Sequence, residues 1–293
     1  MQIIKIGKND AGQRLDSFLK KLMPAAPYSL LYKYLRTNKL KLNGKKPDFA
    51  VRLCEGDEIK FFGDESLIQK NGFTPISHSL DIVYEDENIL IINKPPKMGC
   101  QPDIGHPTGS LVDAVKSYLF DKGEYNPDME NSFAPALCNR IDFNTRGIVI
   151  AAKNAAALRI INEKIRAREI RRFYICTTLG CPKEREGVIR KRIEKDTRTN
   201  KSRTVEKGGR YAETHYRVLS FKDGRALIEA EIITGLSHQI RTHLSSIGCP
   251  IAGDSKYGGG SGGQQLTSYK TVMDFKSDAG ILNYLKGKEF AIL

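Results

Sequence analysis

The sequence predicts an α+β protein, in which a large mixed or antiparallel β-sheet follows a small α+β unit. Three observations lead to this prediction. The chain has 293 residues, enough for one large domain and one small one. From about residue 79 onward, β-rich runs outnumber the helical segments that could serve as crossovers between parallel strands. Residues 63–78 lack periodicity and carry turn-forming residues, which is typical of a linker.

Two amphipathic helices are expected near the N-terminus. Residues 11–24 place leucines and Phe18 at helical spacing before Pro24. Residues 29–38 carry apolar residues on one side and basic residues on the other. We therefore expect two short helices that cover one side of a small sheet.

Short strands are expected to complete this first unit. The dipeptide Asn43-Gly44, flanked by alternating residues, is a strong hairpin signal. Residues 51–62 read as another strand pair. We thus place a first domain at residues 1–62, a linker at 63–78 and a second domain at 79–293.

The second domain contains a longer series of apolar strands. A flexible loop is expected at the glycine-rich residues 258–263, where no strand-to-helix transition supports a dinucleotide site. The expected strands lie within residues 80–96 (two strands around a turn at 85–88), 147–154, 171–180, 211–221 and 226–234, and the expected helices lie within 110–120, 155–168 and 238–248.

The net charge of +13 points to a polyanionic partner. The charge is concentrated in two blocks. Residues 1–62 hold 13 Lys and Arg against 6 Asp and Glu, and residues 161–210 hold 16 against 7. Residues 63–160, between the blocks, are acidic overall. On charge alone, basic loops that merely face water remain an alternative.

Several classes of protein are disfavoured by the sequence. The N-terminus is too polar for a signal peptide, and no apolar run reaches the length of a membrane span. The six cysteines are scattered without a C-x-x-C pair, which favours reduced thiols over disulfides or a zinc site. We therefore expect a cytoplasmic protein that does not interact with membranes.

Metal and cofactor motifs are also missing from the sequence. There is no Walker loop, no H-E-x-x-H and no G-x-S-x-G. His238 and His243 are five residues apart on an expected helix, which sets them roughly 140° apart around its axis. A shared metal is therefore disfavoured, and we expect neither a metal nor a cofactor.

Three polar segments interrupt the apolar strands and are candidates for chemistry. They are residues 139–147, 172–174, and 235–241 with their continuation 250–258. The first contains Asp142, directly before a buried strand. An aspartate at such a place often only caps a turn, so the residue alone does not establish a catalytic role.

Together, these segments resemble the motifs of the RluA-type pseudouridine synthases. The family patterns are H-R-L-D-x-x-T-S-G, K-x-Y, and G-R-x-H-Q-I-R followed by P-I-x-G-D-x-x-Y-G, and they occur here in order. Residues 85–99 also resemble the strand-turn-strand K-P-x-G segment of the family. Residues 1–62 are similar to the S-four-like RNA-binding domain of a small-subunit ribosomal protein. This pairing is similar to the bacterial synthases that modify large-subunit ribosomal RNA.

The resemblance implies the pseudouridine synthase fold and an enzyme that isomerises uridine in RNA. It implies that Asp142 is the catalytic aspartate, Tyr174 the active-site tyrosine and Arg241 the basic partner of the aspartate. Substrate contacts are expected from five further residues of the motifs, namely Arg140, Thr145, Arg146, His238 and Gln239. A uridine inside a helix is out of reach, so the base is expected to flip into the site.

This chain departs from the family patterns at three positions. Asn139 stands where the family has His, Arg146 where it has Ser, and Leu236 where it has Arg. The expected partner is RNA, ribosomal RNA in the first place, and a monomer is expected. Two alternatives stay open, a tRNA pseudouridine synthase and a catalytically inactive RNA-binding or ribosome-assembly protein.

Overall fold

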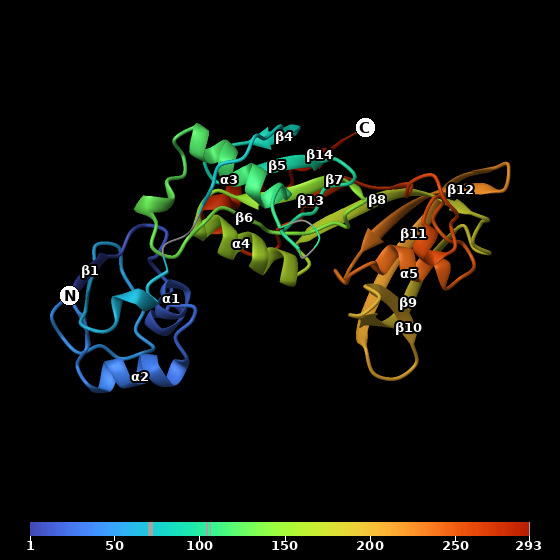
Figure 1. Cartoon of the computed structure of the whole chain (residues 1–293). Helices are drawn as coiled ribbons and strands as arrows, with labels where there is room; N and C mark the ends of the chain where they lie inside the picture. The colour runs from blue at the N-terminus through green and yellow to red at the C-terminus, as the bar shows by residue number, and fades with distance from the viewer. Residues whose placement is uncertain (70–72, 104, 106, 293) are drawn as a thin grey trace.

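The computed structural model describes residues 1–69, 73–103, 105 and 107–292. Its N-terminal part is a three-stranded sheet in the order β1-β3-β2 with two helices (Figure 1). The elements are β1 Gln2–Lys5, α1 Leu15–Leu22, α2 Tyr28–Arg36, β2 Leu40–Leu42 and β3 Glu58–Phe61. Both predicted helices are confirmed. The strand pair predicted for residues 51–62 is wrong, since only β3 is a strand and Arg52 contributes a single bridge to Arg14.

The N-terminal helices are held by a hydrophobic cluster of their own. Phe18 and the leucines that predicted α1 are almost completely buried in it. Leu67 and Ile68 also pack against this cluster, although they lie in the stretch predicted to be a linker. Residues 70–72 of that stretch lie outside the described residues. Beyond them, Phe73 packs near Phe120 and so belongs to the larger part of the chain.

The larger part is built on a sheet whose strands follow the order β10-β9-β11-β12-β8-β13-β7-β5-β4, with β14 paired to β13 and β6 to β7. The predicted α+β class with a mixed sheet is confirmed, because β13 runs parallel to β7 while its other pairings are antiparallel. The strands are β4 Ile82–Glu85, β5 Ile89–Lys94, β6 Ala136–Leu137, β7 Arg146–Ala152, β8 Ile170–Leu179, β9 Glu186–Asp196, β10 Lys201–Val205, β11 Arg210–Lys222, β12 Arg225–Ile232, β13 Leu266–Met273 and β14 Glu289–Ala291.

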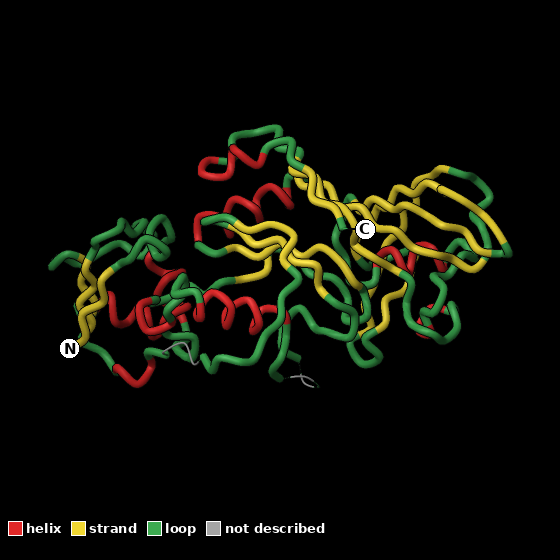
Figure 2. Tube along the Cα trace, turned by 90° about the horizontal axis from the view of Figure 1, so that it is seen from above, coloured by secondary structure: helices red, strands yellow, loops and turns green. Residues whose placement is uncertain are grey.

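The alternation of apolar residues along the central strands sets the layers. In β5, Leu90 and Ile92 join one cluster and Ile89 and Ile91 join another, because successive side chains point to opposite faces. The first cluster contains residues of α3 and α5, and the second contains residues of α4 and the C-terminal segment. These helices are α3 Leu111–Asp121, α4 Ala155–Arg166 and α5 Gln239–Ser245, with 3-10 turns at Glu65–Leu67, Pro127–Met129, Ser255–Tyr257 and Gly280–Leu285. Figure 2 shows the helices flanking the strands.

Ser110 begins α3 as predicted, through a capping box in which its side chain and that of Asp113 each bond the other's backbone amide. The glycine-rich loop at residues 258–263 is mostly exposed but touches the preceding segment closely. A Cβ on Gly253 would lie 1.8 Å from the carbonyl oxygen of Gly263, so the two stretches of backbone are in direct contact. This contact brings the glycine-rich loop against residues 251–253 at the side of α5.

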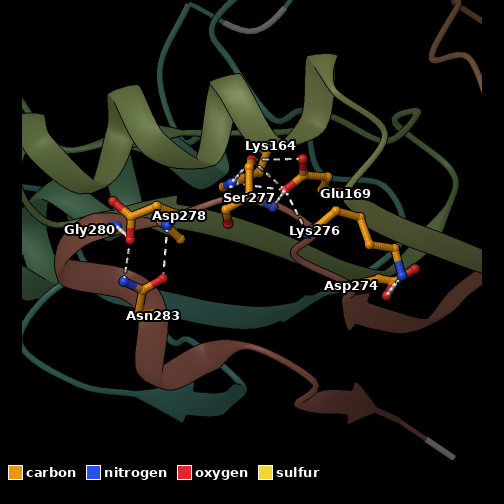
Figure 3. A network of polar contacts seen from close by, with 9 residues as sticks. Lys164, Glu169, Asp274, Lys276, Ser277, Asp278, Gly280 and Asn283 are labelled. Carbon is orange, nitrogen blue, oxygen red and sulfur yellow. Dashed lines mark hydrogen bonds and ion pairs between the residues drawn. The ribbon is translucent and has the colours of Figure 1, made fainter.

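The C-terminal segment is fixed to the turn between α4 and β8 by a buried polar network (Figure 3). Lys164, which is 1% exposed, donates to Glu169 at 2.8 Å and to the hydroxyl and carbonyl oxygens of Ser277. The hydrogen bond from Lys164, assisted by Ser277 and the backbone amide of Lys276, lowers the pKa of Glu169 to about 2. The network therefore holds both ends of the α4–β8 turn in place.

A polar interface joins the N-terminal part to the rest of the chain. Asp10 accepts hydrogen bonds from Asn131 at 2.7 Å and from Ser132 at 2.6 Å. Asn9 donates to Glu130 and accepts from the backbone amide of Ala155 at the start of α4. Water could satisfy the hydrogen-bonding groups of this interface if the two parts separated. The apolar faces of a hydrophobic core could not be satisfied in this way. No helix among the described residues has the length and apolar character of a membrane span.

Candidate active site

A cleft of about 1110 Å³ opens beside α5. Segments far apart in the sequence meet there. Its walls include the turn before β7, the end of α4, the start of β8, the loop after β12, and the 3-10 turn that follows α5. Of the eight predicted site residues, seven line this cleft: Arg140, Asp142, Thr145, Tyr174, His238, Gln239 and Arg241.

Asp142 sits at the first position of a turn closed by a hydrogen bond from the amide of Thr145 to the carbonyl of Asp142. Its carboxylate does not cap this turn. Instead, Oδ2 accepts a hydrogen bond of 2.8 Å from Nη1 of Arg241, 99 residues further along the chain. The turn thus serves to present the carboxylate to the cleft, where it is partly exposed.

Arg241 binds two carboxylates at once. Its Nε and Nη2 donate to Asp254 at 2.7 and 2.9 Å, and Nη1 donates to Asp142. Burial alone would lower the pKa of Arg241, but Asp254 and Asp142 raise it above its ordinary value. Asp254 is 2% exposed and binds the guanidinium of Arg241 from the interior of the protein. Asp142 binds the same guanidinium at the surface of the cleft.

His238 lies at the head of α5 with a left-handed backbone, at φ 55°. Its Nδ1 is 2.9 Å from the hydroxyl of Tyr257, and its Nε2 is 4.0 Å from Oδ2 of Asp142. Burial lowers the pKa of His238, so the ring is neutral near pH 7. His243 faces the other way, and its Nδ1 is 2.9 Å from the hydroxyl of Thr214.

Tyr174 points from β8 into the same cleft and is 5% exposed. Burial raises the pKa of its hydroxyl, which therefore stays protonated at neutral pH. Its neighbour across the sheet is Ser268 of β13. The tyrosine, the carboxylate and the arginine are thus delivered by three separate elements.

The other predicted residues differ in how they are engaged. Arg140 is exposed and its Nη1 lies 3.4 Å from Gln101, whereas Thr145 is buried and accepts a hydrogen bond from Gln264. Gln239 lines the cleft, but its amide is occupied by protein groups. It accepts from Thr234 and from the amide of Leu236, and donates to Thr214 and to the carbonyl of Glu213. Its side chain therefore shapes the loop before α5.

Arg146 is the one predicted site residue outside the cleft lining. It begins β7, is exposed, and its Nε bonds Oδ1 of Asn93 at 3.3 Å. The prediction that it contacts substrate is not supported by this position. The neighbouring Gly147 explains why the turn is tightly specified, because a Cβ there would lie 2.2 Å from the carbonyl oxygen of Ser268.

A comparison with known proteins identifies the family of this chain. The sequence profile of the RNA pseudouridylate synthase family matches residues 88–246. This chain belongs to that family. The match contains Asp142, Tyr174 and Arg241, and it confirms the resemblance to RluA-type synthases. The enzyme is thus an isomerase that acts on RNA.

Relatives extend the similarity over most of the chain. A protein of Mycoplasma capricolum described as an uncharacterized RNA pseudouridine synthase is 34% identical over 97% of this chain and 94% of its own length. The ribosomal large subunit pseudouridine synthase D of Yersinia pestis is 30% identical over 87% of this chain and 75% of its own. The human RNA pseudouridylate synthase domain containing 1 shares the fold, with a TM-score of 0.57, 20% identity, and coverage of 75% of this chain and 86% of its own.

Two site residues of the enzyme were missed by the sequence reasoning. Asp254 lies in the P-I-A-G-D segment, yet its role as the buried partner of Arg241 depends on a contact that only folding creates. Lys94, in the K-P-P segment, is completely buried and donates to the carbonyls of Pro95, Met98 and Phe143. Burial lowers the pKa of Lys94 to about 8, while Asp142 acts in the opposite direction.

Over the part of the chain that the structure describes, no group of three or more His, Cys, Asp or Glu side chains is placed to hold a metal ion. Asp142 and Asp254 are both bound to Arg241, which already supplies the positive charge that carboxylates would seek from a metal.

Proposed function

We propose that this enzyme converts uridine to pseudouridine in large-subunit ribosomal RNA, with Asp142 as the group that acts on the ribose. The observation that carries the proposal is the hydrogen bond from Arg241 to a partly exposed Asp142 inside a cleft also lined by Tyr174. An RNA-binding protein without catalysis has no use for this pair.

The chemistry follows from the atoms that must move. The bond between N1 of uracil and C1′ of ribose breaks, the base turns, and C5 bonds to C1′ while its proton is lost. The carboxylate of Asp142 can form a bond with C1′ as the base leaves, as in retaining glycosidases, and that bond breaks again when C5 bonds to C1′; or the carboxylate can take a proton from the sugar to expel the base. In both routes Arg241 keeps the carboxylate oriented, and Asp254 keeps Arg241 in place.

Tyr174 is suited to hold the base while it turns. Its ring is buried at the floor of the cleft and can pack against uracil. Its hydroxyl is protonated at neutral pH, which favours a role as hydrogen-bond donor to the base. Neutral His238, which faces Asp142 at 4.0 Å, can donate a hydrogen bond within the cleft without adding a positive charge.

The choice of ribosomal RNA is supported by two features. The N-terminal part carries exposed Lys33, Arg36, Lys39, Lys45 and Lys46 beside its sheet, which fits binding to RNA phosphates. A relative that is 30% identical is a ribosomal large subunit pseudouridine synthase. Such an enzyme would work in the cytoplasm, where ribosomal RNA of bacteria is made. We expect no cofactor and a monomer.

The test is a map of pseudouridines in total RNA from cells with and without the gene, and from cells that express Asp142→Asn. We expect one or a few sites in large-subunit rRNA that disappear in both the deletion and the mutant. Sites lost from tRNA instead would replace the rRNA assignment by a tRNA synthase. An unchanged map, with a growth or assembly defect in the deletion, would favour an inactive RNA-binding protein. Turnover by purified Asp142→Asn would remove Asp142 from the reaction.

A further inference from the structure

Arg172 lines the cleft without a partner of its own. It belongs to β8, two residues before Tyr174, and is only 8% exposed. Its Nε is buried and makes no hydrogen bond, and within the described residues its guanidinium forms neither a side-chain hydrogen bond nor an ion pair. A buried donor without an acceptor costs free energy, whereas the terminal nitrogens of this guanidinium face the cleft. Its presence beside the cleft therefore calls for an anion that arrives from outside.

Two neighbouring arginines show what a satisfied guanidinium looks like in this protein. Arg241 is bound by two carboxylates. Arg171, the residue before Arg172, donates to both oxygens of Glu231 at 2.7 and 2.9 Å. Glu231 is thus already occupied. Arg172 lacks any such acceptor, although it is more buried than Arg171.

Gly235 leaves the guanidinium of Arg172 uncovered. A Cβ at position 235 would lie 3.4 Å from Nη1 and 3.5 Å from Nη2 of Arg172, and Gly235 itself lines the cleft. A larger side chain would occupy the space over these two nitrogens. The backbone of Gly235 does not need the left-handed region, so the glycine is explained better by the space it leaves than by its conformation.

The position of Arg172 is fixed relative to the catalytic residues. The turn that leads into β8 is held by the network of Lys164, Glu169 and Ser277 (Figure 3). Further along the strand, the charges of Arg172 and Asp142 act on the hydroxyl of Tyr174 in opposite directions. Both charged groups therefore lie around the place where the base would be held.

We propose that Arg172 binds a phosphodiester group of the RNA strand that delivers the uridine to Asp142. The inference rests on the proposed function, because it specifies which group of the RNA substrate binds beside Arg172. A guanidinium offers two parallel N–H donors that match two phosphate oxygens, and RNA brings one phosphate with every nucleotide. Arg166 and Arg168 also line the cleft and make its field more positive.

The test compares Arg172→Gln with Arg171→Gln, which removes the same charge one residue away. Both substitutions are made in the full-length protein. Turnover is measured with each substitution alone, and binding is measured with each one combined with Asp142→Asn, so that the RNA is not converted. Binding of a short oligouridylate is measured at several salt concentrations. We expect Arg172→Gln to weaken binding about tenfold or more, as for loss of a charge-assisted hydrogen bond, and to reduce the log–log salt slope by about 0.7. Arg171→Gln should change neither.

Three further measurements separate binding from a structural role. Arg172→Lys should keep most of the salt slope while it loses part of the affinity, because lysine retains the charge but not the fork. Gly235→Val should weaken binding with Arg172 still present. Arg172→Met should raise the melting temperature, because it removes an unpaired buried charge. A melting temperature lowered by Arg172→Met, or equal effects of the two Gln variants, would overturn the proposal.

The outcome stays informative if the proposed function fails. Oligouridylate binding does not require that the enzyme modify ribosomal RNA, so a negative pseudouridine map leaves the phosphate test intact. Conversely, a positive map with unchanged binding and turnover in Arg172→Gln refutes only the phosphate site. A binding loss that is equal at all salt concentrations would also refute it, and would point to a contact with an uncharged group of the RNA.

Discussion

Arg241 connects an exposed carboxylate to a buried one, and this sharing determines what a substitution there does. Asp254 takes two of its donors and Asp142 takes the third. The planar guanidinium can span both carboxylates only because its nitrogens are fixed in one fork. An ammonium group has the same charge but offers a single point of contact.

We expect Arg241→Lys to lower kcat by about 100-fold or more, with RNA affinity within a few-fold of wild type. The lysine can stay with Asp254 or reach Asp142, so the orientation of Asp142 is lost. Single-turnover rates at saturating RNA measure this effect. Arg217→Lys is the matched control, since Arg217 pairs with Glu229 on the exposed face of the sheet. Equal rates in wild type and Arg241→Lys would show that the bridge is dispensable.

The sequence could predict one partner of Arg241, which is Asp142, but not the other, which is Asp254. Asp142 and Arg241 were found through motifs, and the structure brings them within hydrogen-bonding distance. The isolation of Arg172 could not be found in this way, because a missing partner is a property of three-dimensional surroundings. The place of Arg146 outside the cleft lining could not be found either, since its position in the motif does not say which side of β7 faces the cleft.

At the scale of elements, α5 carries Arg241 on one side and a fully buried histidine on the other. His243 is 0% exposed and contacts Thr214 through Nδ1, while its Nε2 has no hydrogen-bond partner in the described chain. Burial, with a contribution from the charge of Lys191, lowers the pKa of His243 to about 4. The helix is therefore anchored by a neutral imidazole.

This burial predicts a loss of stability in mild acid. In the unfolded chain the histidine takes up a proton as the pH falls below about 6.5, whereas the folded protein resists until about pH 4. The free energy of unfolding should fall over that window by up to about 3 kcal/mol. Urea titrations should show that the free energy of unfolding declines less between pH 7 and pH 5 in His243→Gln than in wild type. The control is His215→Gln, at a more exposed histidine, in which the free energy of unfolding should decline as in wild type. An equal decline in His243→Gln would show that the burial of His243 does not cause the loss of stability.

Elements with an apolar face were predictable, and those without one were not. The strand β7 is almost uniformly apolar and was expected, whereas β9 and β10 were missed. Their segments alternate charged residues with few inward apolar ones, such as Ile189 and Ile193. β9 pairs with β11, β10 pairs with β9, and both contact α5. Such strands depend on tertiary neighbours, which local periodicity does not record.

At the scale of the whole molecule, the two hydrophobic clusters of the larger part are separate from that of the N-terminal part. The contacts between the parts are hydrogen bonds such as those of Asp10 with Asn131 and Ser132. Removal of the N-terminal part would expose polar groups that water can satisfy. The predicted boundary at residue 62 remains a prediction, and the packing of Leu67 and Ile68 favours a cut after Gln69.

We expect the enzyme without residues 1–69 to fold and to isomerise uridine when RNA is saturating. Its RNA affinity should fall, and its salt dependence should flatten because fewer phosphate contacts release fewer counterions. Affinity at several salt concentrations, together with turnover at saturating RNA, tests both points. A truncated protein with the full salt slope would exclude this part from RNA binding. A folded but inactive one would show that it helps to assemble the cleft.

The place of β13 in the sheet has a consequence for synthesis on the ribosome. Leu266–Met273 lies between β8 and β7 and is the only strand of the described sheet that links its two halves by direct pairing on both sides. Translation supplies this strand after about nine-tenths of the chain. The N-terminal part can fold early, but the halves that carry Asp142 and Arg241 are clasped together only when β13 has emerged. Nascent chains that stop short of it lack the strand that joins the two halves, so the cleft is completed only when the polypeptide is nearly finished.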